Sequence, residues 1–510
     1  MYPGIYAKTS PSAVAQTYVP SGHTVTWADL DAGSNRLAHL LRRRGLTVGD
    51  GVAILMGNRP PFLDITWAAQ RSGLYYTTLS PRLTAAEDAY IVGDCAAKAL
   101  VVEASAPAAA ELLALCPGVE VALVVGGELD GYESYDDAVA DMPTTPIDDE
   151  TDGRELLYSS GTTGRPKGIK RPLTGLHPAE LQGPLRELFQ GPHYDIGPDT
   201  VYLSTAPLYH SAPIVFSMMV QRLGGQVVTL EKFDPELAVD TLDRYRITHS
   251  QWVPTMFVRM LRLPEEVRAR YEGGTHRIAL HAAAPCPRNV KEQMLDWWGP
   301  IINEYYSATE MIGSTFTTAE EWLAHPGTVG RAVMGELHIL GDDHEEVPTG
   351  ETGEVWFSGG PTFEYHNDPE KTARAYDDKG WATVGDLGHV DSEGYLYLTD
   401  RKNFTIISGG VNIYPQEIED ALITDPRVLD VAVFGVPNEE FGEEVKAVVQ
   451  PVDGVGGDEL RDDLLALCRR ELAGYKQPRS LDFRPELPRD PNGKLYKRLL
   501  RDEYLQKERA

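Results

Sequence analysis

The sequence has no run of 18 apolar residues, few cysteines and a shortage of positive charge. A membrane-spanning helix needs about 20 mostly apolar residues, so none is predicted, and the first residues lack the basic and apolar regions of a signal peptide. The 47 Lys and Arg residues against 76 Asp and Glu residues give a net charge of -29, which disfavours nonspecific binding to nucleic acid or an anionic membrane. We therefore expect a soluble cytoplasmic protein that holds any anionic ligand with local cationic groups.

The four cysteines, Cys95, Cys116, Cys286 and Cys468, stand far apart and form no C-x-x-C pair. This spacing favours buried or incidental thiols over a metal or redox centre. The chain has 510 residues, of which 42% are apolar and 24% charged. That is the composition of an ordinary globular protein, with enough length for about two to four domains.

Between residues 52 and 302, short apolar runs alternate with helical patterns, which indicates parallel sheets covered by helices. Helices are predicted at residues 35–44 and 235–245, and in the alanine-rich stretch at residues 104–114. Buried strands are predicted at residues 51–56, 99–102, 119–125, 201–205, 227–230 and 278–281.

From residue 328 the pattern changes to short strands with turns, at residues 335–339, 354–358 and 395–398, which predicts a small antiparallel unit. After residue 400 it becomes a mixture of strands and helices, with helices at residues 415–423 and 458–472. The predicted fold class is therefore α/β, with parallel sheets and the antiparallel unit in a large N-terminal domain, residues 1–400. A small α+β domain, residues 401–510, follows it.

A loop rich in glycine and hydroxyl groups follows the apolar pair at residues 156–157. Residues 158–168 read Tyr-Ser-Ser-Gly-Thr-Thr-Gly-Arg-Pro-Lys-Gly. Glycines let backbone N–H groups turn toward an anion, hydroxyls add donors and Lys167 adds a positive charge, so the loop is suited to phosphate. It is not a Walker A loop, because Pro166 stands where glycine is needed and Gly168 where Ser or Thr is needed. Its composition alone also fits an ordinary surface loop.

Three later segments carry further polar groups. Residues 303–310 read Asn-Glu-Tyr-Tyr-Ser-Ala-Thr-Glu after an apolar pair, which places them at the C-terminal end of a strand, where open α/β sheets bind ligands. Asp386 stands in a glycine-flanked turn, and Lys494 stands in a turn near the C-terminus. Taken singly, these patterns are also typical of a helix N-terminus, a turn cap and a solvated lysine.

In this order, the four segments resemble the motifs of the adenylate-forming superfamily, which contains acyl-CoA synthetases, aryl-CoA ligases, peptide-synthetase adenylation domains and beetle luciferases. The resemblance runs from residue 26 to residue 494, and residues 399–419 are similar to the family's interdomain hinge and the strand after it. It implies a mobile C-terminal domain, ATP, coenzyme A and Mg²⁺ as cofactors, and a small-molecule carboxylic acid as substrate. It also allows a homodimer.

The resemblance implies a role for each residue of the segment at 303–310. Tyr306 would stack on adenine, Thr309 would contact the α-phosphate and Glu310 would be the metal ligand. One carboxylate suffices, because Mg²⁺ keeps several waters and also binds phosphate oxygens. Ser307 departs from the family pattern, in which glycine is usual.

By the same resemblance Asp386 accepts hydrogen bonds from the ribose, Arg401 reaches the ribose and phosphates, and Lys494 reaches the substrate carboxylate and the α-phosphate. An ionised acceptor for a diol and a fixed cation for phosphate suit these roles. The implied catalytic set is Lys494, Thr309, Glu310 and His210. The implied ATP and AMP set is Ser159, Ser160, Gly161, Thr162, Thr163, Gly164, Lys167, Ala283, Ala284, Pro285, Glu304, Tyr305, Tyr306, Ser307, Ala308, Thr309, Asp386, Arg401 and Lys494.

The remaining implied residues bind the acid and coenzyme A or form the hinge. The acyl pocket would be lined by His210, Ser211, Trp252, Val253, Met256, Ala282, Ala283, Ser307, Met311 and Ile312. Ser408, Gly409 and Gly410 would border the coenzyme A channel, and Lys402 and Asn403 would form the hinge. Asn403 stands where many members carry Lys or Asp; asparagine tolerates unusual backbone angles, so it is compatible with a hinge but supplies no charge.

The resemblance predicts an ATP-dependent acyl-CoA synthetase. Because the implied acyl pocket is mostly apolar, a hydrophobic monocarboxylic acid is expected, with a fatty acid as the first choice and an aryl or alicyclic acid as the alternative. A further alternative is an adenylation enzyme that passes the acyl-adenylate to another acceptor. A peptide-synthetase domain would carry an aspartate for the amino group within residues 206–213, and none is there. A luciferase-like oxygenase would be distinguished by an assay of coenzyme A dependence. A noncatalytic nucleotide-binding protein could lack Lys494 or Glu310, and both are present.

Overall fold

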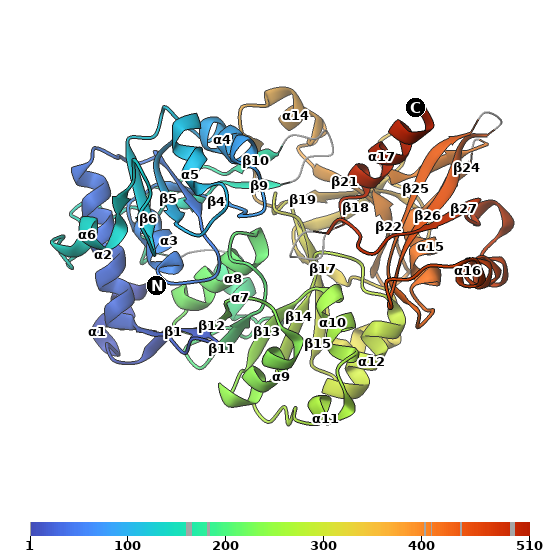
Figure 1. The fold of residues 1–510 in the computed structure, drawn as a ribbon, viewed down its shortest axis with the longest axis horizontal. Coiled ribbons are helices and arrows are strands. Elements are labelled where there is room, and N and C mark those ends of the chain that lie inside the picture. Colours follow the sequence, from blue (N-terminus) through green and yellow to red (C-terminus); the bar gives the residue numbers. More distant parts are fainter. Residues whose placement is uncertain are drawn as a thin grey trace.

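The structure, a computed structural model, describes residues 2–159, 166–180, 184–401, 404–409, 411–438, 441–489 and 495–509. Figure 1 shows two sheet-containing units formed by the N-terminal part of the chain, up to β17, with the C-terminal elements packed at one side. The chain is an α/β protein, as predicted, and its described residues form five sheets. No helix in the described ranges has the length and apolar character needed to cross a membrane.

The first sheet has six parallel strands, in the order β7-β6-β5-β3-β4-β8. Val52 and Ile54 of β3 pack into one apolar cluster, whereas Ala53 and Leu55 pack into another, so both faces of the sheet are covered. The strands are β3 (Gly51–Leu55), β4 (Tyr75–Leu79), β5 (Ala97–Glu103), β6 (Val121–Val125), β7 (Glu133–Ser134) and β8 (Arg154–Glu155). The helices are α1 (Pro3–Thr9), α2 (Trp27–Arg43), α3 (Phe62–Arg71), α4 (Ala85–Asp94), α5 (Ala109–Leu112) and α6 (Tyr135–Ala140).

The second sheet has nine strands, in the order β17-β16-β15-β14-β13-β11-β12-β1-β2. Its six central strands are parallel, and β2, β16 and β17 pair antiparallel at the edges. The strands are β1 (Val14–Val19), β2 (Thr24–Thr26), β11 (Val201–Ser204), β12 (Gln226–Leu230), β13 (His249–Trp252), β14 (Ile278–His281), β15 (Ile302–Ser307), β16 (Ser314–Thr317) and β17 (Arg331–Met334). The helices are α7 (Pro184–Gln190), α8 (Ser211–Arg222), α9 (Pro235–Arg244), α10 (Pro254–Leu261), α11 (Glu265–Arg268), α12 (Arg288–Trp298) and α13 (Ala319–Ala324).

Two smaller sheets adjoin these. A three-stranded sheet contains β9 (Leu157–Ser159), β10 (Lys167–Lys170) and β20 (Glu364–Tyr365), with α14 (Pro369–Arg374) after it. The antiparallel sheet expected after residue 328 has four strands, β18 (Glu336–Leu340), β19 (Gly353–Ser358), β21 (Ala382–Val390) and β22 (Leu396–Arg401). The predicted domain boundary at residues 400–401 falls at the end of β22.

The C-terminal part of the chain forms a five-stranded sheet covered by helices (Figure 1). Its elements are β23 (Ile406–Ser408), β24 (Val411–Ile413), α15 (Pro415–Leu422), β25 (Val428–Asn438), β26 (Gly442–Pro451), α16 (Asp458–Glu471), β27 (Ser480–Phe483) and α17 (Lys497–Arg509). Arg262, just after α10, donates from Nη2 to the carbonyl oxygen of Val428, 3.1 Å away. This hydrogen bond joins the second sheet's helices to the C-terminal part.

One sequence-based prediction of local structure was wrong. The alanine-rich stretch at residues 104–114 is not one helix, because only Ala109–Leu112 is α-helical, followed by a short 3₁₀ turn. The segment at residues 303–310 is predicted at the C-terminal end of a strand, and its first five residues form part of that strand, since β15 runs from Ile302 to Ser307. Pairing with β14 on one side and β16 on the other supplies the hydrogen bonds that extend it, and the tyrosines favour a strand.

Candidate active site

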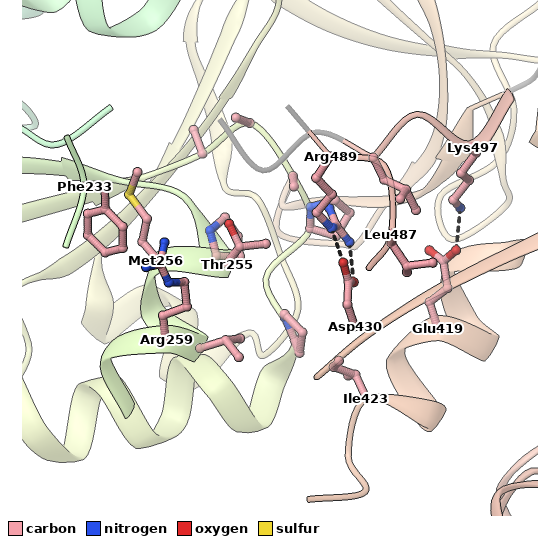
Figure 2. Close-up of a pocket in the computed structure, with 18 of the residues that line it drawn as sticks. Phe233, Thr255, Met256, Arg259, Glu419, Ile423, Asp430, Leu487, Arg489 and Lys497 are labelled. Atoms are coloured by element: carbon pink, nitrogen blue, oxygen red, sulfur yellow. Dashed lines mark hydrogen bonds and ion pairs between the residues drawn. The ribbon is translucent and has the colours of Figure 1, made fainter. Parts of the chain in front are cut away.

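The main cavity, of about 920 Å³, lies between the second sheet and the C-terminal sheet. Figure 2 shows Phe233, Met256 and Arg259 on one side of it, and Arg489 and Lys497 on the other. The N-terminal side is formed where parallel strands end, which is the usual ligand position in open α/β sheets. The cavity is therefore bounded by residues that are more than 200 positions apart in the sequence.

The end of β15 reaches the cavity beside the Gly-Asp turn of β21. Tyr306 and Asp386 both line the cavity, and the Tyr306 hydroxyl donates to Oδ2 of Asp386 over 2.7 Å. Gly385, with φ +82°, adopts a conformation that L side chains rarely take, so the turn that presents Asp386 needs glycine. Two residues from separate predicted motifs are thus in direct contact.

Glu304 belongs to a buried charged cluster. Lys291 of α12 donates from Nζ to Oε2 of Glu304 over 2.6 Å, and Nε2 of His281 lies 3.4 Å from the same oxygen. Burial raises the pKa of the Glu304 carboxyl, and the Lys291 ammonium opposes that rise. Burial also lowers the pKa of His281 far below its ordinary value, which keeps the imidazole neutral. The cluster fixes Glu304, which lines the cavity.

The segment after β14 forms another part of the wall. Ala282, Ala283, Ala284 and Pro285 all line the cavity. Ala283 has φ +76°, a left-handed conformation that is uncommon for a residue other than glycine. Such backbone outliers persist only where the surrounding structure holds them, and they cluster at functional sites.

Glu310 and Lys167 are brought together through a residue that the sequence analysis missed. Tyr365 of β20 donates its hydroxyl to Oε1 of Glu310 over 2.8 Å, and Nζ of Lys167 lies 4.8 Å from the centre of its ring. Glu310 is buried. Tyr365 therefore links the phosphate-loop lysine to the predicted metal ligand.

The donor set fits Mg²⁺ bound through a nucleotide. No group of three or more His, Cys, Asp or Glu side chains that could hold a metal occurs among the described residues. A hard carboxylate such as Glu310, with remaining positions taken by water and phosphate oxygens, is the environment that Mg²⁺ prefers. The described residues also contain no set of protein ligands of the kind that holds Zn²⁺.

Two ion pairs stand on the C-terminal side of the cavity (Figure 2). Arg489 contacts Asp430 with Nη2–Oδ1 at 2.7 Å, and Nζ of Lys497 lies 2.8 Å from Oε1 of Glu419. All four residues line the cavity. Arg489 also forms an isolated antiparallel bridge with Leu495. Arg489 and Leu495, the described residues on either side of the segment that contains Lys494, both line the cavity.

The structure does not describe every predicted site residue. Ser160, Gly161, Thr162, Thr163, Gly164, Lys402, Asn403, Gly410 and Lys494 lie outside the described residues, as does the side chain of Arg401. Ser159 and Lys167 are paired in neighbouring strands β9 and β10. Ser408 and Gly409 are described but do not belong to the lining of the main cavity.

The predicted acyl-pocket residues fall into two groups. Met256, Ala282, Ala283 and Ser307 line the main cavity. Trp252 and Val253 are buried in an apolar cluster, with the Trp252 indole donating to Ser250 over 2.6 Å. His210, Ser211, Met311 and Ile312 also lie outside the lining; Ile312 is buried and Met311 has φ +54°.

Sequence reasoning also missed three cations, Arg82, Lys232 and Arg259, which line the main cavity and are exposed. The Arg259 guanidinium lies 4.8 Å from the centre of the Phe233 ring. No local motif marks these three residues, nor Lys291 and Tyr365. They can be found only once the helices, loops and strand that carry them are packed together.

The chain matches two protein-family models. The model described as AMP-binding enzyme matches residues 6–364. The model described as AMP-binding enzyme C-terminal domain matches residues 417–494. Together they include three of the four motifs, namely the phosphate loop, the segment at residues 303–310 and the turn with Lys494. The Gly-Asp turn with Asp386 lies between the two matched ranges.

Two similar curated proteins are a feruloyl-CoA synthase from Amycolatopsis sp and the long-chain-fatty-acid–CoA ligase FadD13 of Mycobacterium tuberculosis. The first is 35% identical over 497 residues, covering 96% of each chain. The second is 30% identical over 502 residues, covering 98% of this chain and 97% of the relative. Among solved structures, MatB from Rhodopseudomonas palustris is 29% identical and covers 99% of this chain and 100% of its own. Its TM-score is 0.83 for the ATP-bound structure and 0.72 for the apo structure.

Proposed function

Because the chain belongs to the AMP-binding enzyme family and is an AMP-forming acid–CoA ligase that uses ATP and coenzyme A, we propose that it activates a hydrophobic monocarboxylic acid, with a fatty acid as the first candidate. The contact between Tyr306 and Asp386 is the observation that supports this site most directly. It joins the predicted adenine and ribose residues in the wall of a cavity that also contains Phe233 and Met256. Nucleotide and apolar acid would thus meet in one space.

In the first half-reaction, a carboxylate oxygen of the acid attacks the α-phosphorus of ATP. A bond forms between that oxygen and phosphorus, the bond to the bridging oxygen of the β-phosphate breaks, and pyrophosphate leaves. No general base is needed, since the carboxylate is ionised at neutral pH. Thr309, Lys167 and Lys494 would hold the phosphates in place. Mg²⁺, held by Glu310, would supply further positive charge to the phosphate oxygens.

In the second half-reaction, the coenzyme A sulfur attacks the acyl carbonyl carbon, the mixed anhydride bond breaks, AMP leaves and the thiol proton goes to solvent. We propose that the C-terminal domain rotates between the steps about residues 402–403, which would bring Ser408–Gly410 to the cavity and withdraw Lys494. The higher TM-score to ATP-bound than to apo MatB supports an arrangement suited to the first step.

An aryl acid is the second candidate substrate, because a feruloyl-CoA synthase is 35% identical over nearly the whole chain. A panel of saturated fatty acids, hydroxycinnamates and alicyclic acids, scored by pyrophosphate release with ATP, would identify the acid class. Release with none of these acids would refute the proposed substrate class. Repeating the assay with and without coenzyme A, and with amines in its place, separates a CoA ligase from an enzyme that uses another acceptor.

Replacement of Asp386 should weaken ATP binding. Asp386→Ala removes an ionised acceptor for the ribose diol, a loss of about 1.5 to 3 kcal/mol for a charged hydrogen bond. Equilibrium titration with ATP would measure it. Tyr306→Phe, which removes only the hydroxyl that bonds to Asp386, is the matched control and should have the smaller effect. ATP affinity unchanged in Asp386→Ala would contradict the assignment.

The exposed cations Arg82, Lys232 and Arg259 supply positive charge at the cavity in a chain of net charge -29. We propose that they attract the phosphates of coenzyme A. Arg259→Ala should raise the KM for coenzyme A about threefold to tenfold, with the rate of acyl-AMP formation unchanged, because exposed charge interactions contribute about 1 kcal/mol. The effect should shrink as salt is added. A raised KM for the acid instead would indicate that Arg259 binds a second carboxylate.

A further inference from the structure

The loop at residues 206–210 lies between β11 and α8 and carries His210 at its end. It follows the carboxyl end of a parallel strand, where open α/β sheets bind ligands, and Pro207 and Tyr209 line the main cavity. Buried backbone N–H and C=O groups need hydrogen-bond partners, and a loop has no neighbouring strand to supply them. The partners of this loop therefore show what fixes its course.

Asn58, which follows β3 of the first sheet, makes two hydrogen bonds to this loop and a third to β12. Its Nδ2 donates to the carbonyl oxygen of Ala206 over 3.1 Å and to that of Leu230 over 2.8 Å. Its Oδ1 accepts from the backbone N–H of Leu208 over 2.7 Å. Asn58 is only 6% exposed, and both of its amide hydrogens are used. One side chain thus joins the carboxyl ends of β3, β11 and β12, which belong to two different sheets.

A second side chain of the first sheet holds the same loop. Thr78 of β4 is buried and donates its hydroxyl to the carbonyl oxygen of Tyr209 over 2.8 Å. The backbone N–H of His210 donates to the carbonyl oxygen of Pro207 over 3.1 Å, which closes a turn. Three backbone groups of the loop are therefore bonded to the first sheet, and His210 follows directly after the last of them.

The anchor of the loop is itself fixed. The backbone N–H of Gly57 donates to Oε2 of Glu103 over 3.0 Å, and Nη1 of Arg59 lies 2.6 Å from Oε1 of the same carboxylate. Glu103 ends β5, the neighbour of β3, so both residues beside Asn58 are bound to one point of the first sheet. Leu208 is fully buried in the apolar cluster that packs against this sheet. Movement of the loop relative to the first sheet would break these contacts.

We propose that Asn58 is a positioning residue for the acid site, which together with Thr78 fixes the 206–210 loop and thereby the place of His210. The inference rests on the proposed function, because it takes His210 as a residue that contacts the acid. It assigns a role to a residue that belongs to none of the four motifs. An amide suits this role, since it offers two donors to carbonyl oxygens and one acceptor to an N–H at the same time.

The effect should fall on the acid and not on the nucleotide. The hydrogen bonds of Asn58 and Thr78 go to the loop and to β12, whereas Tyr306 and Asp386, the predicted adenine and ribose residues, lie on β15 and β21. Asn58→Ala should lower kcat/KM for the acid about tenfold to a hundredfold, because a shift of about 1 Å in a positioned group costs up to that much. The Kd of ATP, measured by titration, should stay within about twofold of wild type, since distant sites contribute nearly independently.

Pyrophosphate release with dodecanoate, ferulate and cyclohexanecarboxylate as the acids gives kcat/KM for the wild type and the variant. Equal losses for acid and ATP, or an unchanged kcat/KM for the acid, would overturn the inference. Hydrogen exchange at the Leu208 amide tests the hold on the loop without any acid. It should be about tenfold faster in Asn58→Ala than in wild type, because the acceptor of that N–H is gone. An unchanged exchange rate would also contradict the role of Asn58.

Thr78→Val separates positioning from direct contact. Asn58 lines the main cavity, so a ligand can reach it, whereas Thr78 does not belong to the lining. Valine keeps the shape of threonine and removes the hydroxyl that bonds to Tyr209. This variant should lower kcat/KM for the acid about twofold to tenfold, the contribution of one hydrogen bond. A kcat/KM at the wild-type value would mean that Asn58 acts by touching the ligand, and would overturn the positioning role.

Asn35→Ala is the matched control for loss of stability. Asn35 of α2 is fully buried and donates from Nδ2 to the carbonyl oxygen of Thr144 over 2.8 Å, outside the main cavity. Like Asn58→Ala, it should lower the melting temperature, but kcat/KM for the acid and the Kd of ATP should stay near wild type. A loss in kcat/KM as large as that of Asn58→Ala would trace the effect to general instability, and the inference would fail. Absence of pyrophosphate release by the wild type with all three acids would instead refute the proposed function, while hydrogen exchange would still decide whether Asn58 holds the loop.

Discussion

Lys494→Ala should slow acyl-AMP formation by roughly a hundredfold to a thousandfold, the loss seen when one preorganised donor to a transition state is removed. Thiol attack on supplied acyl-AMP should be nearly unaffected. The reason is that charge develops at the α-phosphate only in the first step, and the domain rotation would withdraw Lys494 before the second. Stopped-flow measurement of both half-reactions on the same variant tests this difference.

The structural support comes from residues on either side of Lys494, which itself lies outside the described residues. Arg489, Leu495 and Lys497 all line the main cavity, and the Arg489–Asp430 and Lys497–Glu419 ion pairs hold the two ends of the segment. Lys476→Ala is the matched control, because Lys476 pairs with Glu417 outside the cavity. It should slow neither step. Equal slowing of both steps by Lys494→Ala would refute domain alternation, though not the ligase function.

Glu310→Gln should lose most of its activity, about tenfold to hundredfold, and raising the Mg²⁺ concentration should recover part of it. The amide oxygen is still a weak metal ligand and can still accept the Tyr365 hydroxyl bond, but the negative charge is gone. The Mg²⁺ dependence of ATP binding, measured by titration at several metal concentrations, reports the same change without relying on turnover.

Tyr365→Phe is the companion variant for Glu310, because it removes the hydroxyl that holds the carboxylate and keeps the charge. We expect a smaller loss than in Glu310→Gln and nearly normal dependence on Mg²⁺. If Glu310→Gln retains activity within twofold of wild type at low Mg²⁺, Glu310 does not bind the metal directly.

Local sequence patterns predicted several strands of the two large sheets, such as β3, β5, β11, β12 and β14, because a strand buried on both faces is apolar along most of its length. Val52–Leu55 and Ile278–Leu280 are such runs, and they lie in β3 and β14. The patterns failed where pairing decided the outcome. β13 (His249–Trp252) carries polar side chains that become buried only because β11 and β14 lie on either side of it.

The sequence by itself determined the family and the chemistry, since the order of the phosphate loop, the Thr-Glu segment, the Gly-Asp turn and the C-terminal lysine requires no folding to be seen. Only the tertiary structure decided which side chains meet. The Tyr306–Asp386 bond joins residues 80 positions apart, and the Glu310–Tyr365 bond joins residues 55 positions apart. Such contacts depend on how strands from separate parts of the chain pair and pack. A local residue pattern contains no information about which distant residues will lie next to each other.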